Sequence, residues 1–214
     1  MSSPAPPPPL AARRGRPARS DQQAESSRGR IVAAARQLFA SEGYEGVSMR
    51  KIAALAECSP AALYTLFPSK RQLLRGIWEE VFSELMTELE AAGAEAAPAL
   101  RVEALCLAYV DFWLRRPDDY RAIFLIEDRL QGTQDHFFVD SSEALQRDAF
   151  FIRAIAEAQA RGELRPGDPG HLRNLLLCGV QGIAMNLITI PEFPWGDPGQ
   201  LKQDTIRALL AGLR

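Results

Sequence analysis

Apolar residues recur at helical spacing through almost the whole chain after residue 28. A period of about 3.6 residues places apolar side chains on one face of an α-helix, whereas a half-buried strand alternates apolar and polar residues. In the segment 29–42, for example, Ile31, Ala35 and Leu38 share such a face. The sequence therefore predicts an all-α fold. The predicted helices, about nine, cover 29–42, 49–57, 60–67, 70–92, 98–116, 117–128, 142–161, 171–190 and 200–213.

Composition and charge divide the chain into three regions. Residues 1–27 combine a proline-rich stretch with the basic sequence RRGRPARS, so we expect a disordered tail. Residues 28–75 form the second region and residues 76–214 the third. The first 75 residues carry a net charge of +7 and the remainder a net charge of −9. A basic front and an acidic remainder indicate that only the front meets a polyanion.

Two short predicted helices, joined by the turn sequence ECS, carry the most specific pattern. Ser48 precedes the first helix and Ser59 the second, and serine is a favoured cap at a helix start. Pro60 suits the first turn of the second helix, and Leu63 and Phe67 share its inward face. This order is typical of a helix-turn-helix, in which the first helix braces the second and the second is presented to DNA.

Residues 28–75 resemble the DNA-binding domain of the TetR family of bacterial regulators. The resemblance rests on the stretch IVAAARQLFASEGYEGVSMRKIAALAECSPAALYTLFPSKRQLL. Three positions depart from the family pattern: Glu57 stands where the turn usually has glycine, Ala61 where glycine is common, and Leu66 where tyrosine or histidine is usual. The first departure requires the turn to accept a side chain, and the other two affect base contacts. The remaining chain resembles the family mainly in the number and length of its helices.

This resemblance implies DNA contacts on and around the second short helix. Ser48, Tyr64 and Lys70 would contact phosphates, and Thr65 a phosphate or a base. Arg50 would read a base edge, because arginine matches guanine O6 and N7. At the start of the second helix, Ser59 would cap the helix. Pro60, Ala61 and Ala62 would offer apolar contacts to thymine methyl groups.

The basic tail offers a second contact with DNA. An extended Arg-Gly-Arg-Pro segment is thin enough to lie in a narrow A·T minor groove, with Arg14 and Arg16 pointing inward. A basic tail can equally raise affinity for any DNA sequence without reading it. Both interpretations stay open at this point.

The third region is rich in aromatic side chains, and the family resemblance implies a cavity there for a small hydrophobic effector. The candidate lining residues are Phe82, Met86, Tyr109, Phe112, Trp113, Phe124, Phe150, Met185 and Asn186. The predicted helices 171–190 and 200–213 would form a homodimer interface, with Gly179 and Gly182 permitting close approach. Two copies related by a two-fold axis predict a pseudo-palindromic operator.

The sequence contains no pattern typical of metal binding, disulfide bonding or catalysis. His136 and His171 lack the spacing of metal ligands, and the three cysteines lie far apart, so we expect no metal, cofactor or disulfide. Catalytic motifs such as GxSxG and HExxH are absent, so we expect no enzyme activity. A cytoplasmic protein without membrane association is predicted, since no secretory signal is evident and the longest apolar run contains Gln181 and Asn186.

These observations predict a ligand-responsive transcriptional repressor that leaves its operator when the effector binds. Activation rather than repression remains an alternative, as does an architectural DNA binder that tolerates many sequences. A third alternative is a helical carrier or enzyme whose front domain is vestigial.

Overall fold

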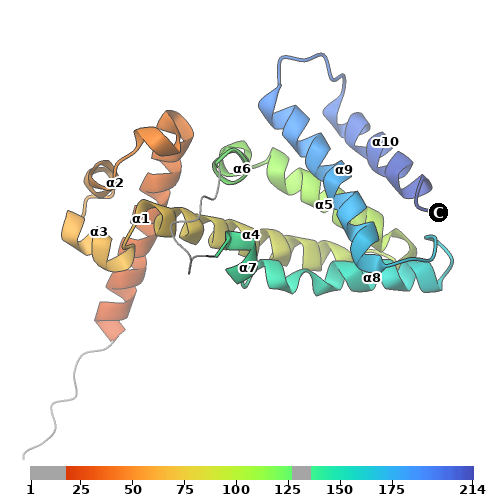
Figure 1. Cartoon of the computed structure of the whole chain (residues 1–214), viewed down its shortest axis with the longest axis horizontal. Helices are drawn as coiled ribbons and strands as arrows, with labels where there is room; N and C mark the ends of the chain where they lie inside the picture. The colour runs from red at the N-terminus through yellow and green to blue at the C-terminus, as the bar shows by residue number, and fades with distance from the viewer. Residues whose placement is uncertain (1–17, 127–135) are drawn as a thin grey trace, which may run out of the picture.

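A computed structural model describes residues 18–126 and 136–214, and it describes side chains from residue 25 onward. These ranges contain ten α-helices and two short 3₁₀ helices and no strand, which confirms the predicted all-α class (Figure 1). Helices α1 to α3 form a small head at one end of the molecule, and the later helices form a bundle at the other (Figure 1).

The head consists of α1 (Ala18–Gly46), α2 (Met49–Leu55) and α3 (Pro60–Leu66). Its first helix begins at Ala18, so the prediction of a disordered tail was wrong for residues 18–27. The helix was predicted to end at residue 42, and the structure has a break at the next residue, Gly43. Gly43 has φ 72° and ψ 161°, a conformation that breaks the helix and that glycine adopts without strain.

The remaining elements follow in chain order. They are α4 (Lys70–Glu95), η1 (Pro98–Leu100), α5 (Arg101–Leu114), α6 (Pro117–Phe124), α7 (Phe138–Ser141), η2 (Leu145–Asp148), α8 (Ala149–Ala160), α9 (Pro169–Thr189) and α10 (Pro198–Ala211).

The segment between α6 and α8 differs most from expectation. The predicted helix over 142–161 begins only at Ala149, and the short helices α7 and η2 precede it. Ser142 explains the break, because it is buried and its Oγ accepts a hydrogen bond from Leu145 N at 3.1 Å. A serine that bonds to the backbone two or three residues onward competes with a continuous helix. Residues 127–135, which include most of the gap between the predicted helices 117–128 and 142–161, lie outside the described residues.

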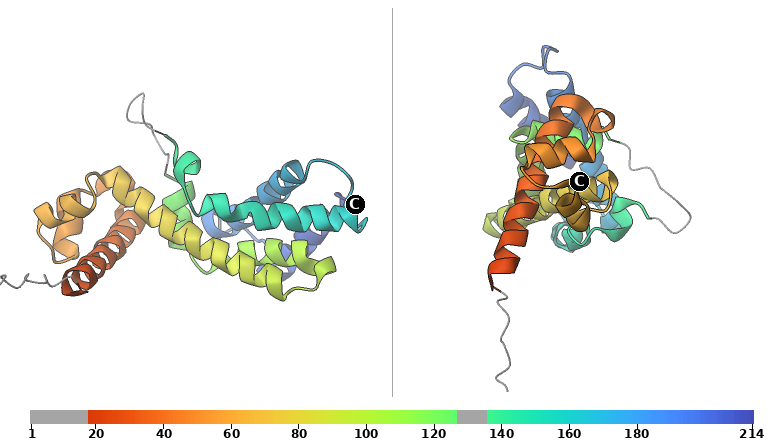
Figure 2. Two further views of the ribbon diagram at one scale, coloured as in Figure 1. Left: turned by 90° about the horizontal axis from the view of Figure 1, so that it is seen from below. Right: turned by 90° about the vertical axis from the view of Figure 1, so that its left-hand side faces the viewer.

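The long helix α4 connects the head to the bundle (Figure 2). Its first turns pack on α1, and its length packs along α5. Buried side chains recur on it every three or four residues, as the sequence pattern predicted. They are Leu73, Leu74, Ile77, Trp78, Val81, Phe82, Leu85, Met86 and Leu89.

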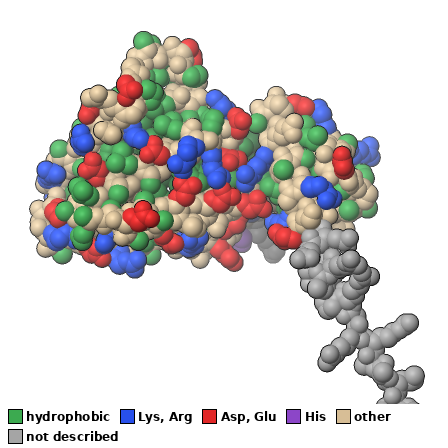
Figure 3. All heavy atoms as spheres, turned by 180° about the vertical axis from the view of Figure 1, so that it is seen from behind, with side chains coloured by type: hydrophobic (Ala, Val, Ile, Leu, Met, Phe, Trp, Pro, Cys, Tyr) green, Lys and Arg blue, Asp and Glu red, His purple; other side chains and the backbone are tan. Residues whose placement is uncertain are grey.

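Charged side chains of both signs gather where the head meets the bundle (Figure 3). Arg36 of α1 pairs with Glu80 of α4 at 3.5 Å and with Asp119 of α6 at 3.6 Å. Arg116 pairs with Asp119 at 3.7 Å and also with Glu84. These contacts tie α1, α4 and α6 together.

Helix α9 packs against α5, α8 and α10. Among the described helices it alone is long and apolar enough, by length and composition, to cross a membrane, and a core helix of this length can pass the same test. Gly179 permits the close approach to α10 within one chain, because a Cβ there would clash with a methyl carbon of Leu209. Gly182 has open space instead.

Candidate DNA interface and effector pocket

Helices α2, α3 and α4 each start with a serine cap. Ser48 Oγ accepts from Lys51 N at 3.3 Å, and Ser59 Oγ accepts from Ala62 N at 3.1 Å. Ser69 caps α4 in the same way. Because each cap satisfies a backbone N–H group that the helix itself leaves free, the starts of α2, α3 and α4 are fixed locally.

The turn between α2 and α3 contains a strained residue. Glu57 has φ 52°, and it is the one described residue other than glycine with a positive φ. The left-handed region costs about 1 kcal/mol for a residue with a Cβ. The turn is nevertheless closed by a hydrogen bond from Cys58 N to Ala53 O at 3.0 Å. The turn requires a positive φ at this position, which explains the glycine of the family pattern. Glu57 adopts this conformation although its Cβ makes it unfavourable.

The outward face of α3 is smooth and exposed. Leu63 and Phe67 point inward and are buried, as predicted. The predicted contact residues of the head other than Lys70 are exposed: Ser48, Arg50, Ser59, Pro60, Ala61, Ala62, Tyr64 and Thr65. Thr65 Oγ1 donates to Ala61 O at 2.9 Å, so its hydroxyl must rotate before it can donate to a phosphate.

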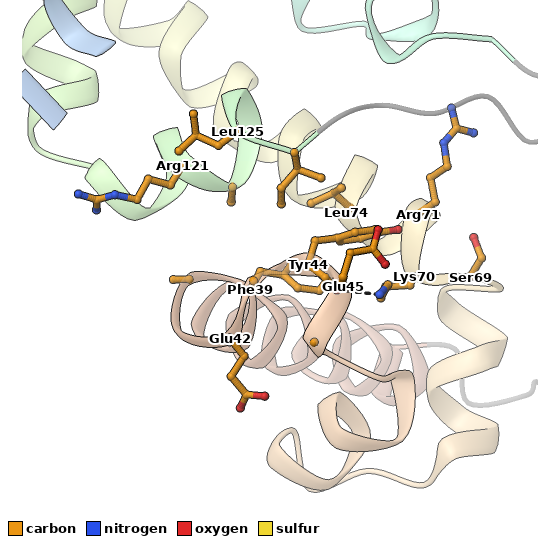
Figure 4. Close-up of a pocket in the computed structure, with 15 residues that line it drawn as sticks. Phe39, Glu42, Tyr44, Glu45, Ser69, Lys70, Arg71, Leu74, Arg121 and Leu125 are labelled. Carbon is orange, nitrogen blue, oxygen red and sulfur yellow. Dashed lines mark hydrogen bonds between the residues drawn. The ribbon is translucent and has the colours of Figure 1, made fainter. Parts of the chain in front are cut away.

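Lys70 does not face the outer surface of the head. Its Nζ donates to Tyr44 O at 2.7 Å and to Val47 O at 3.1 Å, and it lies 4.1 Å from the centroid of the Tyr44 ring (Figure 4). The ammonium group thus binds two backbone carbonyls of the turn that follows the break at Gly43. The geometry does not support the predicted phosphate contact for Lys70. Arg14 and Arg16 lie outside the described residues.

An apolar pocket of about 460 Å³ lies in the bundle. It is lined by Phe82, Leu85, Met86, Leu89, Tyr109, Phe124, Val139, Leu145, Asp148, Phe150, Phe151, Arg173, Leu177, Cys178 and Gln181. Five predicted lining residues are among them: Phe82, Met86, Tyr109, Phe124 and Phe150. Five helices, α4, α5, α6, α8 and α9, and the α7–η2 segment therefore converge on one cavity of a size common for small-molecule sites.

The other four predicted lining residues lie elsewhere. Phe112 and Trp113 are fully buried in the core. The Trp113 ring lies 6.0 Å from that of Phe82 and 5.2 Å from that of Phe124, both edge-on, so it supports the pocket from behind. Met185 is exposed on α9, and Asn186 is partly exposed and does not line the pocket. Helical spacing identifies an aromatic face but does not say which member of the face borders empty space.

The polar residues of the pocket were missed by the sequence reasoning, apart from Tyr109. The Tyr109 hydroxyl donates to Gln181 Oε1, and Gln181 Nε2 donates to the Tyr120 hydroxyl at 2.9 Å. Burial raises the pKa of Tyr109 well above its ordinary value and that of Tyr120 to about 12. Both phenols are therefore neutral at pH 7. Gln181 interrupts the apolar run of α9, and this was the available signal for it.

A second polar pair lies farther along the pocket wall. Arg173 of α9 forms an ion pair with Asp148 at the end of η2, and both side chains line the pocket. The arginine charge is therefore balanced by a neighbouring carboxylate. Neither residue belongs to the aromatic pattern from which the pocket was predicted.

The α7–η2 wall of the pocket is fastened to α4. Ala144 N donates to Glu79 Oε1 at 2.7 Å, and Arg147 donates to Glu90 at 2.8 Å. The Phe138 ring packs edge-on against Trp78, with centroids 5.2 Å apart. The α7–η2 wall and α4 are therefore joined by hydrogen bonds and by ring packing.

A larger cleft of about 830 Å³ lies between the end of α1, the start of α4 and α6 (Figure 4). Two of its cationic side chains, Lys70 and Arg121, are engaged with neighbouring groups. Lys70 binds the end of α1, and Arg121 donates to Ile188 O at 2.8 Å and pairs with Asp118. Because Lys70 and Arg121 connect neighbouring elements across it, this cleft is a joint between head and bundle, and the apolar pocket is the better ligand site.

Comparison with known proteins agrees with this architecture. Residues 31–77 match the family model described as bacterial regulatory proteins, tetR family, and residues 102–209 match the tetracyclin repressor-like C-terminal domain. The chain is 30% identical over 149 residues to the HTH-type transcriptional repressor NicS of Pseudomonas putida, covering 67% of this chain and 68% of NicS. It is 28% identical over 160 residues to the nucleoid occlusion factor SlmA of Cronobacter sakazakii, covering 72% and 78%.

Solved structures show the same likeness over most of the chain. A protein of unknown function from Rhodococcus sp. RHA1 superimposes with a TM-score of 0.71 at 25% identity, covering 87% of this chain and 95% of that one. The SmeT–triclosan complex superimposes with a TM-score of 0.67 at 25% identity, covering 88% and 92%. With one family model on the head and a second spanning half of the chain, this protein belongs to the TetR family of DNA-binding transcriptional regulators.

Proposed function

We propose that this regulator is a homodimeric repressor that binds a pseudo-palindromic operator and is released by a small hydrophobic effector. One observation carries the proposal, namely that α4 belongs to both sites. Its Gly76 packs against Phe67 at the end of α3, where a Cβ would lie 3.1 Å from the ring. Its later residues Phe82 and Met86 line the apolar pocket.

One contact lies near the start of α4 and the other farther along it, so α4 links the head to the pocket. A ligand favours one conformer only by binding it more tightly than the other. A ligand that displaces Phe82 or the α7–η2 wall shifts α4, and α4 then moves α3 relative to its copy in the dimer. The similarity to the transcriptional repressor NicS supports repression. The similarity to SmeT, whose structure contains triclosan, supports an apolar aromatic effector.

The dimer would form through α9 and α10. Leu175 and Met185 of α9 are 38% and 45% exposed in the single chain, although α9 is apolar along most of its length. These exposed apolar side chains on an otherwise apolar helix support a dimer interface there. The variant Met185→Asp should sediment as a monomer and bind the operator weakly. A monomeric wild-type chain would contradict this part of the proposal.

Operator release is tested with DNA sites selected from a random pool. The full chain is titrated with triclosan and with other aromatic compounds that raise its melting temperature. We expect pocket binders to weaken operator affinity about 5- to 150-fold, the usual range of allosteric coupling. Tyr64→Ala is the control, since it should bind the compounds but not the operator. A saturating pocket ligand that leaves operator affinity unchanged would contradict the mechanism.

The likeness to nucleoid occlusion factors keeps a second candidate, an architectural DNA binder. Competition against random DNA separates the two. A repressor retains its selected sites under a large excess of random sequence, whereas a sequence-tolerant binder loses them.

A further inference from the structure

Two polar groups interrupt the apolar pocket wall, and both stand on α9. Gln181 contacts Tyr109 at one position, and Arg173 contacts Asp148 at the other. Eight residues of α-helix separate them, which corresponds to about 12 Å along the axis. A ligand in this pocket therefore meets an apolar middle section and two polar positions of different character.

Gln181 keeps part of its hydrogen-bonding capacity. A glutamine amide has two N–H donors and an oxygen with two acceptor positions. The bonds with Tyr109 and Tyr120 use one acceptor position and one N–H. One N–H donor and one acceptor position of Gln181 remain beyond these two bonds. A hydroxyl group can donate to the oxygen and accept from the nitrogen, whereas a carboxylate can only accept.

The other polar position does not attract a net charge. Arg173 and Asp148 are both partly buried, with side chains 23% and 30% exposed, and they pair with each other. An anion drawn toward the guanidinium would also meet the carboxylate. It would lose its hydration without gaining an unmatched counter-charge, which makes binding of a charged ligand unfavourable.

We propose that the effector is an uncharged aromatic compound bearing a hydroxyl group, and that the Asp148–Arg173 pair excludes carboxylates from the pocket. This proposal rests on the effector-binding function proposed above. The hydroxyl group binds Gln181, and the rings lie against Phe82, Met86 and Phe124. The pair selects the ligand by charge balance, and Gln181 selects it by its remaining donor and acceptor.

The proposal is tested with three matched probes: naphthalene, 2-naphthol and 2-naphthoate. Their affinities for the full chain are measured by calorimetry at pH 7. We expect 2-naphthol to bind about fivefold more tightly than naphthalene, as one neutral hydrogen bond provides. We expect 2-naphthoate to bind no more tightly than naphthalene. Equal affinities for naphthalene and 2-naphthol, or tightest binding of 2-naphthoate, would overturn the proposal.

Variants separate the two polar positions. Gln181→Leu should reduce 2-naphthol to the affinity of naphthalene and leave naphthalene unchanged. Asp148→Asn leaves the arginine charge unmatched, so 2-naphthoate should bind at least tenfold more tightly than to the wild type. The double variant Asp148→Asn/Arg173→Gln should restore the wild-type order. A double variant that binds 2-naphthoate far more weakly than the wild type would show that Arg173 anchors anions, and it would overturn the filter.

Operator binding measured with the same probes distinguishes this proposal from the proposed function. If the probes bind in the expected order but leave operator affinity unchanged, the ligand class holds and the repressor mechanism fails. If only 2-naphthoate releases the operator, the ligand class fails and the mechanism holds. Circular dichroism of each variant confirms that the chain is folded.

Discussion

Helix α3 of the helix-turn-helix and the core helix α5 are held in place in different ways. Helix α3 has one buried residue, Leu63, and starts with the Ser59 cap. Helix α5 has no side-chain cap but buries seven residues, Trp113 among them. The surface helix is fixed by local bonds at its ends, and the core helix by packing along its length. The outward side chains of α3 can therefore change at little cost in stability, whereas α5 tolerates little change.

The largest expected effect contrasts one aromatic residue from each helix. Trp113→Ala should lower the free energy of unfolding by about 3–5 kcal/mol, because it removes the centre of the aromatic cluster and leaves a cavity. Tyr64→Ala should change it by no more than about 0.5 kcal/mol, because Tyr64 is exposed. Denaturant unfolding of both variants measures the difference. Similar losses at the two positions would break the comparison.

Lys70→Met tests whether the start of α4 serves stability or DNA binding. The variant loses two hydrogen bonds from a charged group to the end of α1, so we expect a loss of about 1.5–3 kcal/mol in unfolding free energy. The salt dependence of operator binding should stay unchanged. A decrease of about one in its logarithmic slope would show that Lys70 contacts a phosphate after all.

Arg50→Ala sharpens the comparison from the DNA side. Arg50 is exposed on α2 beside the smooth face of α3. We expect a loss of about 1–3 kcal/mol in binding and relaxed specificity at one base pair per half-site. Affinity for a panel of operators mutated one base pair at a time provides the measurement. A uniform loss over the whole panel would assign Arg50 to the phosphate backbone.

Glu57→Gly should give the smallest effect, with the opposite sign. The variant relieves the positive φ of the turn, worth about 1 kcal/mol, although the added freedom of glycine in the unfolded chain offsets part of it. Thermal unfolding should show a small rise in melting temperature. The matched variant Glu57→Ala keeps the strain and should show none. Equal melting temperatures for both variants would contradict a strained turn.

The head could be predicted from sequence because its signals are local. Ser48, Ser59 and Ser69 act within three residues of their own positions, and a cap works in the same way whatever surrounds it. The extent of α1 was missed. The run from Ala18 has no apolar period, and a polar helix leaves little trace in such a pattern.

The pocket could be predicted only in part. Helical periodicity correctly placed Phe82, Met86 and Tyr109 on inward faces, but it treated Trp113 in the same way, although Trp113 lies behind the wall. Which inward residue meets empty space depends on the distances between several helices. Those distances follow from packing between segments far apart in the chain.

The sequence by itself determined the all-α class and the helix-turn-helix with its caps, since each depends on spacing within a few tens of residues, and the stretch within 28–75 carried the resemblance to the family. Only the tertiary structure decided that Lys70 turns inward, that Gln181 bridges two tyrosines, and that Arg173 meets Asp148. The physical reason is that a polar side chain takes whichever partner lies within hydrogen-bonding reach, and the fold brings distant residues such as Lys70 and Tyr44 into that reach.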